Sequence, residues 1–144
     1  MSSAAEPRTV LSTFLPTTIT RWVIATAWVN LIVNILIVGT GGLVLLTGSG
    51  MGCPTWPLCT GDSLVPTAEL SGHSIIEFGN RTLTGLLVIS ALLAFLAVVR
   101  LSARPELRAV TFAVGVGVIL QAVIGGITVL LHLHPSVVGV HYVV

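Results

Sequence analysis

Four apolar stretches follow one another along the chain, and the first three are long. They run from about Trp22 to Leu46, Ile75 to Val99, Ala109 to Leu131 and Ser136 to Val144. Each of the first three exceeds the roughly 20 residues that span the hydrocarbon core of a bilayer. A segment in lipid must pair its own backbone amides, so these stretches predict helices although β-branched residues are abundant in them. The pattern predicts an all-α, polytopic membrane protein.

The fourth stretch is too short to span a bilayer. It stops at Val144 in mid-pattern, without a cap, a glycine or a charged residue. We therefore expect a four-helix bundle over residues 21–144 with a truncated fourth helix, in a chain that is a fragment rather than a genuine half-size protein. Residues 1–20 are mixed and polar, and they predict a tail outside the membrane without a cleavable signal peptide.

Composition supports the membrane assignment. Only 8% of the residues are charged, 54% are hydrophobic, and the mean hydropathy is +1.05. A soluble protein needs roughly a quarter of its residues charged. The lipid bilayer must therefore be the solvent of this chain. The net charge of +1 gives no basis for a nucleic-acid partner.

The arginines predict the orientation. Arg8 and Arg21 precede the first stretch. The short connection between the second and third stretches holds Arg100, Arg104 and Arg108, with Pro105 marking the turn. Residues 47–74 hold no Lys or Arg, and carry Asp62 and Glu69 instead. Positively charged loops remain in the cytoplasm. We expect a plasma-membrane protein with a cytoplasmic N-terminus and an outward loop over residues 47–74.

Two cysteines, Cys53 and Cys59, lie in this outward loop and enclose five residues. On an oxidising side of the membrane, a disulfide is the expected state. It would contribute about 2 kcal/mol and hold the loop as a lid. The alternative is a redox-active dithiol, although the spacing is not C-x-x-C. A zinc site lacks further ligands nearby in the sequence.

A polar stripe begins the second apolar stretch. His73, Glu77, Asn80 and Thr84 fall on one helix face, and Arg81 lies one turn after Glu77, where the two can pair. Ionisable residues inside a membrane are costly and usually face the bundle interior, where they have a function. A helix-end anchor at the interface is the alternative. It explains His73 but not the deeper Asn80 and Arg81.

The fourth stretch carries His141, about 9 Å below Pro135 if helical. A neutral imidazole can ligate heme iron. The alternative is a histidine that only hydrogen-bonds a neighbour. His132 and His134 are expected near the outer mouth of the bundle.

Glycine pairs occur at Gly41–Gly42 and at Gly125–Gly126, near the same end of the first and third stretches. They indicate either ordinary close packing of helices or the duplication of a helical hairpin.

The segment Gly41-Gly42-Leu43-Val44 to Cys59 resembles the first loop of heme A synthase, G-G-x-V-R-x-T-G-S-G-x-x-C-P-D-W-P-x-C. Leu45 replaces the arginine of that pattern, which removes a partner for a heme propionate, and Thr55 replaces the aspartate. The second helix of the family carries E-W-x-H-R, and this chain has Glu77-Phe78-Gly79-Asn80-Arg81. Asn80 thus stands where the family has a heme-ligating histidine.

The resemblance implies the N-terminal half of an eight-helix enzyme. That half would bind heme O as substrate and oxidise its methyl group to a formyl group, giving heme A for cytochrome oxidase. Glu77 would act beside the methyl group, and His141 would ligate the iron. Arg81, Asn80 and His73 would complete the heme site, with His73 replacing the missing ligand only if heme or helix shifts.

The resemblance also implies a heme b cofactor in a second four-helix half, absent from this sequence, and contact with a heme O synthase or an electron donor. Three other functions stay open at this point. The chain could be a heme-binding electron-transfer cytochrome. It could be a disulfide oxidoreductase that uses Cys53 and Cys59, or a non-catalytic subunit of a respiratory complex.

Overall fold

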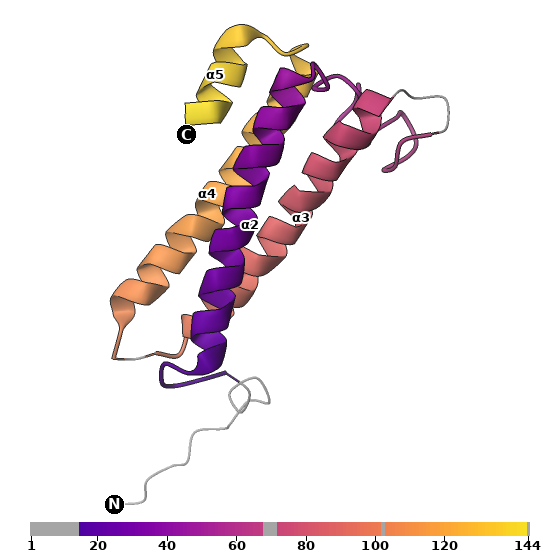
Figure 1. The fold of residues 1–144 in the computed structure, drawn as a ribbon. Helices are drawn as coiled ribbons and strands as arrows, with labels where there is room; N and C mark the ends of the chain where they lie inside the picture. The colour runs from indigo at the N-terminus through magenta and orange to yellow at the C-terminus, as the bar shows by residue number, and fades with distance from the viewer. Residues whose placement is uncertain (1–14, 68–71, 102, 144) are drawn as a thin grey trace, which may run out of the picture.

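The computed structural model describes residues 15–67, 72–101 and 103–143, and every regular element among them is helical (Figure 1). The helices are α2 (Arg21–Leu46), α3 (Gly72–Val98), α4 (Pro105–Leu130) and α5 (Pro135–Val143). The first three are long and apolar enough to cross a membrane. The prediction of an all-α, polytopic membrane protein is confirmed. Part of the predicted tail, residues 1–14, lies outside the described residues, as does Glu69.

Two helices begin earlier than their apolar patterns predict. α3 begins at Gly72 rather than near Ile75, and α4 at Pro105 rather than near Ala109. Pro105 fits the first helical position because the N–H it lacks would have no partner inside the helix. Glu106 follows in the first turn, where the helix dipole favours a negative charge. Pro105 therefore starts a helix and does not mark the turn.

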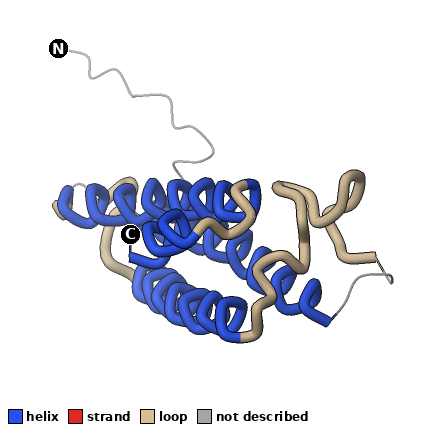
Figure 2. Tube along the Cα trace, turned by 90° about the horizontal axis from the view of Figure 1, so that it is seen from above, coloured by secondary structure: helices blue, strands red, loops and turns tan. Residues whose placement is uncertain are grey.

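The helices form an open bundle in which α3 packs against both α2 and α4, and α5 packs against α4 (Figures 1 and 2). Two small apolar clusters lie in these contacts. One comprises Val23, Ala97, Val98 and Leu101, and the other Val33, Leu87, Ala91 and Val118. Most other large apolar side chains point outward, as expected where lipid replaces water.

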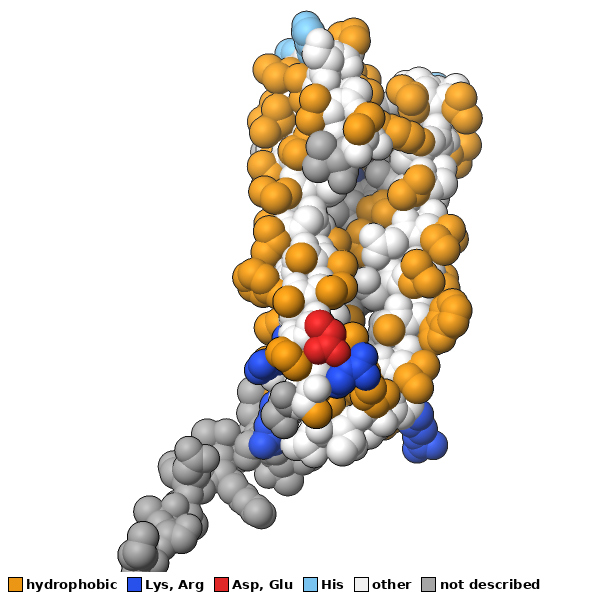
Figure 3. Space-filling view, turned by 90° about the vertical axis from the view of Figure 1, so that its left-hand side faces the viewer, with side chains coloured by type: hydrophobic (Ala, Val, Ile, Leu, Met, Phe, Trp, Pro, Cys, Tyr) orange, Lys and Arg blue, Asp and Glu red, His pale blue; other side chains and the backbone are white. Residues whose placement is uncertain are grey.

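The two ends of the bundle differ in their polar residues. One end, called here the arginine end, holds the start of α2 and α4 and the end of α3. The other, called the loop end, holds residues 47–67 and the turn at 131–134. On the face shown in Figure 3, arginine side chains gather at the arginine end and histidines at the loop end, with apolar side chains between them. Arg81 is the exception, since its guanidinium contacts the loop end.

Hydrogen bonds between side chains join α2 to α3 within the apolar part of the bundle. The Asn30 amide donates to Ser90 Oγ over 3.0 Å, and Thr40 Oγ1 donates to Asn80 Oδ1 over 2.7 Å. Such bonds satisfy polar groups that would otherwise be costly in lipid. They fix α2 against α3 at two depths.

Candidate functional site

The helices α2 and α4 end in the same backbone motif at the loop end. After α2, Gly48 has a φ of 65°, and Ser49 N–H donates to Val44 O over 2.9 Å. After α4, His132 has a φ of 51°, and Leu133 N–H donates to Thr128 O over 2.8 Å. This bond from the second residue past the cap back into the last turn is typical of the Schellman motif.

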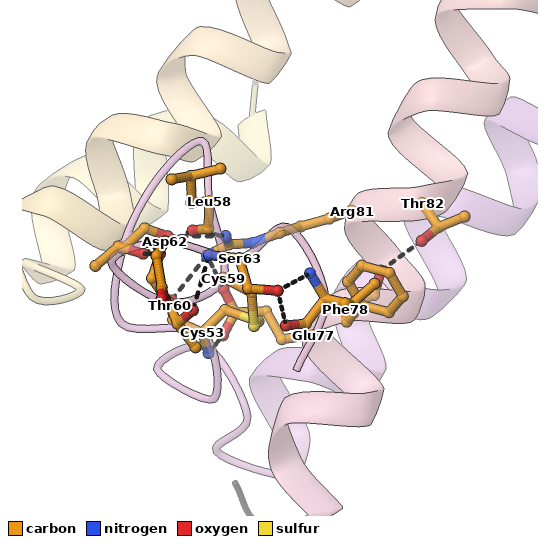
Figure 4. Close-up of a disulfide and its surroundings, with 12 residues drawn as sticks. Cys53, Leu58, Cys59, Thr60, Asp62, Ser63, Glu77, Phe78, Arg81 and Thr82 are labelled. Atoms are coloured by element: carbon orange, nitrogen blue, oxygen red, sulfur yellow. Dashed lines mark hydrogen bonds and ion pairs between the residues drawn. A yellow bond between two sulfur atoms is a disulfide. The ribbon is translucent and has the colours of Figure 1, made fainter. Parts of the chain in front are cut away.

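The segment after α2 is closed by a disulfide. Cys53 and Cys59 are bonded with their Cα atoms 4.4 Å apart, and both are fully buried. The predicted disulfide is therefore present in the structure. Figure 4 shows it beside the first turns of α3, from which Glu77 and Arg81 reach toward the loop.

Arg81 holds the loop through its guanidinium group. It donates to the carbonyl oxygens of Cys53 (2.8 Å), Thr55 (2.8 Å) and Leu58 (3.1 Å), and it forms an ion pair with Glu77. The five N–H groups of an arginine suit such a cluster of acceptors, and its charge strengthens each bond. The contacts fasten the disulfide loop to α3.

Glu77 is only 4% exposed, and both of its carboxylate oxygens have partners. Oε1 pairs with Arg81, and Oε2 accepts the backbone N–H of Cys53 over 2.8 Å. A buried charge is tolerable when it is paired and hydrogen-bonded in this way. The predicted Glu77–Arg81 pair is present, and its geometry shows that it also supports the loop.

The other members of the polar stripe face different neighbours. His73 is exposed, and its Nδ1 lies 2.9 Å from the hydroxyl of Ser49, a buried residue just past the end of α2. Asn80 Oδ1 accepts a hydrogen bond from the hydroxyl of Thr40 on α2. The stripe therefore does not converge on one point, since His73 and Glu77 face the loop and Asn80 faces α2.

His141 lies on α5 with its ring against α4. A Cβ atom at Gly125 would be 3.1 Å from its Cε1 and 3.4 Å from its Nε2. The Nδ1 atom is buried and has no hydrogen-bond partner in the part of the chain that the structure describes. His141 thus differs from His73, whose Nδ1 is hydrogen-bonded. His132 and His134 are exposed in the turn between α4 and α5.

Two aromatic residues at this end have close neighbours that the sequence does not reveal. The indole of Trp56 packs so closely on Gly126 that a Cβ there would overlap it, and the Tyr142 hydroxyl lies 3.0 Å from a Cβ position at Gly42. An indole such as that of Trp56 suits the membrane interface, but this preference does not identify Gly126 as its neighbour. The glycine pairs signal that close neighbours exist, but they do not say which.

Two hollows lie away from this site, toward the arginine end. One of about 230 Å³ is lined by α2, α3 and α4, with Asn30, Ala91 and Thr111 among its residues. None of the predicted site residues lines either hollow. Among the described residues there is also no group of three His, Cys, Asp or Glu that could hold a metal ion. Heme iron is a separate case, because one or two axial ligands suffice.

Comparison with known proteins decides the family. The family model COX15-CtaA, described as cytochrome oxidase assembly protein, matches residues 21–144. A heme A synthase of Alkalihalophilus pseudofirmus is 35% identical over 104 residues, which cover 71% of this chain and 34% of that protein. The chain belongs to the heme A synthase family. No solved structure matches it.

Other heme A synthases are similar over the same share of their length. That of Listeria welshimeri is 32% identical over 109 residues, covering 74% of this chain and 35% of that protein. That of Exiguobacterium is 31% identical over 112 residues, which cover 74% of this chain and 36% of that protein. The chain thus spans about a third of the length of these heme A synthases.

Proposed function

We propose that this chain binds heme O at the loop end and takes part in oxidising its methyl group to a formyl group, which gives heme A for cytochrome oxidase. The observation that carries the proposal is the family match, which extends over all four helices and the disulfide loop. On this proposal the chain forms the substrate-binding half of an oxidoreductase. A second four-helix half would hold heme b, and a heme O synthase or an electron donor would be a partner.

His141 is the proposed iron ligand. Its buried Nδ1 lacks a partner among the described residues, and a buried polar atom of this kind favours a role beyond packing. The ring also lies against a glycine, which leaves the neighbouring surface of α4 without a side chain. His73, Asn80 and Arg81 complete the proposed heme-binding set. The bonds of His73 to Ser49 and of Asn80 to Thr40 would orient them.

Glu77 is the proposed catalytic residue. Its carboxylate is held in one orientation by Arg81 and by the Cys53 N–H, yet each oxygen keeps a second lone pair. A fixed negative charge near the methyl carbon would stabilise positive charge that develops there, or would accept a proton. The proposal also places the disulfide loop and Glu77 on the outer side of the plasma membrane, with the N-terminus in the cytoplasm.

The test is expression of the chain joined to a second four-helix half that supplies heme b, in a host that makes heme O and no heme A, followed by extraction of heme from the membranes. We expect heme A in the extract. Glu77→Ala should abolish the conversion while heme remains bound, and His141→Ala should weaken heme retention. Glu106→Ala, which removes an exposed carboxylate from α4, is the matched control and should change neither. A folded chain that retains heme O unconverted would contradict the proposed reaction.

A further inference from the structure

The glycine pairs of α2 and α4 have no part in the proposed reaction, yet each lies against side chains of the loop end. On α4, Gly125 faces the His141 ring and Gly126 faces the Trp56 indole. On α2, the Cβ position of Gly42 is 3.0 Å from the Tyr142 hydroxyl. A Cβ atom at Gly41 would lie 4.0 Å from Asn80 Oδ1, whereas one at Gly39, Gly115 or Gly117 would meet no side chain or neighbouring element within 4 Å.

These contacts matter because α5 is the shortest of the described helices. It has nine residues, and none of them is buried. A helix shorter than about 12 residues is marginal without tertiary contacts. Its consecutive residues His141 and Tyr142 instead reach glycines on two different helices, α4 and α2. The orientation of α5 therefore depends on the close contacts of His141 with Gly125 and of Tyr142 with Gly42, where the glycines have no side chains.

The α4 pair also joins two segments that are far apart in the sequence. Because Gly125 and Gly126 are adjacent, the ring of His141 and the indole of Trp56 meet the same turn of α4. Trp56 belongs to the disulfide loop, which Arg81 holds against α3. The disulfide loop, through Trp56, and α5, through His141, therefore both pack on the same turn of α4.

We infer that Gly42, Gly125 and Gly126 are positioning residues for His141, and that Trp56, packed on Gly126, is a further positioning residue of the same site. The role in heme binding rests on the proposed function, since it takes His141 as the iron ligand. Side chains at these glycines would displace α5 or the loop and change the environment of the heme. Side chains at Gly115 or Gly117 would enter open space.

The first experiment needs no heme. The full chain in detergent is treated with diethyl pyrocarbonate, and modification of His141 is followed by mass spectrometry of its peptide. Gly125→Val should raise the modification rate of His141 by about tenfold or more, with Gly125→Ala giving a smaller change of the same sign. Gly117→Val is the matched control and should leave the rate unchanged. Equal rates for Gly125→Val and Gly117→Val would overturn the inference.

The second experiment uses chain purified with bound heme, and it reads the absorption and electron paramagnetic resonance spectra of the ferric iron. Gly126→Ala and Gly125→Val should shift both spectra, while Gly115→Ala should not. The double variant Trp56→Ala with Gly126→Ala should show no larger spectral shift than Trp56→Ala alone, because the new Cβ at position 126 then has no indole to overlap. A double variant with the summed effects of both single changes would contradict the contact.

The outcomes separate the two proposals. If His141→Ala leaves the heme spectra unchanged, the iron ligand of the proposed function is wrong, while the modification rates still test the packing. If His141→Ala removes heme but Gly125→Val and Gly126→Ala behave like Gly117→Val and Gly115→Ala, the proposed function stands and the positioning role is wrong.

Discussion

The ends of α2 and α4 at the loop end are built alike and held differently. In each helix a glycine pair precedes the first residue with positive φ by the same interval, since Gly42 and Gly48 are six positions apart and so are Gly126 and His132. The end of α4 differs in that Leu133, the next residue, also has a positive φ, of 57°. Both ends return a hydrogen bond to the last turn in the same way. This likeness is compatible with the duplication of a helical hairpin, which stays a prediction.

The segments beyond the two helix ends differ. The one after α2 is fixed by a disulfide, by the buried carboxylate of Glu77 and by three bonds from Arg81 to backbone carbonyls. The one after α4 is a short turn that leads into α5, a helix without a buried residue. Regions with few buried contacts open at a lower free-energy cost than regions with many. We therefore expect the loop to be the rigid side of the site and α5 the adjustable side.

The largest expected effect comes from removing the charge that fixes the loop after α2. Arg81→Ala leaves the Glu77 carboxylate buried without its cation and three carbonyls without their donor, so it should lower the free energy of unfolding by about 3 kcal/mol. Denaturation in detergent micelles measures this. Amide hydrogen exchange should rise in the loop and stay unchanged in α5.

Arg104→Ala is the matched control for this prediction. Arg104 also pairs with a glutamate, Glu106, but both side chains are about half exposed, at 50% and 55%. Exposed pairs contribute little because water screens them. Equal destabilisation by the two arginine variants would show that Arg81 does not hold the loop as its contacts indicate.

A smaller effect is expected from the covalent bond in the same loop. Replacing Cys53 and Cys59 together with serine should cost about 2 kcal/mol, since the ring is short and constrains few residues of the unfolded chain. Because Arg81 still holds the loop carbonyls, the loop should keep its place on α3. Hydrogen exchange that spreads from the loop into α3 would show that the disulfide, not Arg81, is the main constraint.

The sequence predicted the helices well because lipid imposes a simple rule. A segment that crosses a membrane must be helical and apolar, so the apolar stretches located α2, α3 and α4 to within a few residues. The starts of α3 and α4 were missed because both helices extend past their apolar parts, to Gly72 and Pro105. Helix capping and the interface, rather than hydropathy, set those boundaries.

The site was predicted less completely, since its contacts join distant segments. The Glu77–Arg81 pair could be inferred because the residues lie one helical turn apart. The attachment of Arg81 to the loop carbonyls could not, because nothing in the sequence pairs residue 81 with residues 53, 55 and 58. The glycine pairs indicated close packing, but only the folded chain identifies Trp56, His141 and Tyr142 as their neighbours.

The smallest expected effect tests the likeness of the two helix ends through changes of opposite sign. Gly48 and His132 occupy equivalent positions with φ near 65° and 51°. A left-handed conformation costs a residue with a Cβ roughly 1 kcal/mol, and glycine avoids this cost. Gly48→Ala should therefore destabilise the protein by about 1 kcal/mol, whereas His132→Gly should stabilise it by somewhat less, because glycine also gains freedom in the unfolded chain. Thermal unfolding of the two variants in the same detergent compares them directly. Changes of the same sign would mean that the two ends are not equivalent, and that His132 makes a contact worth more than the backbone strain it bears.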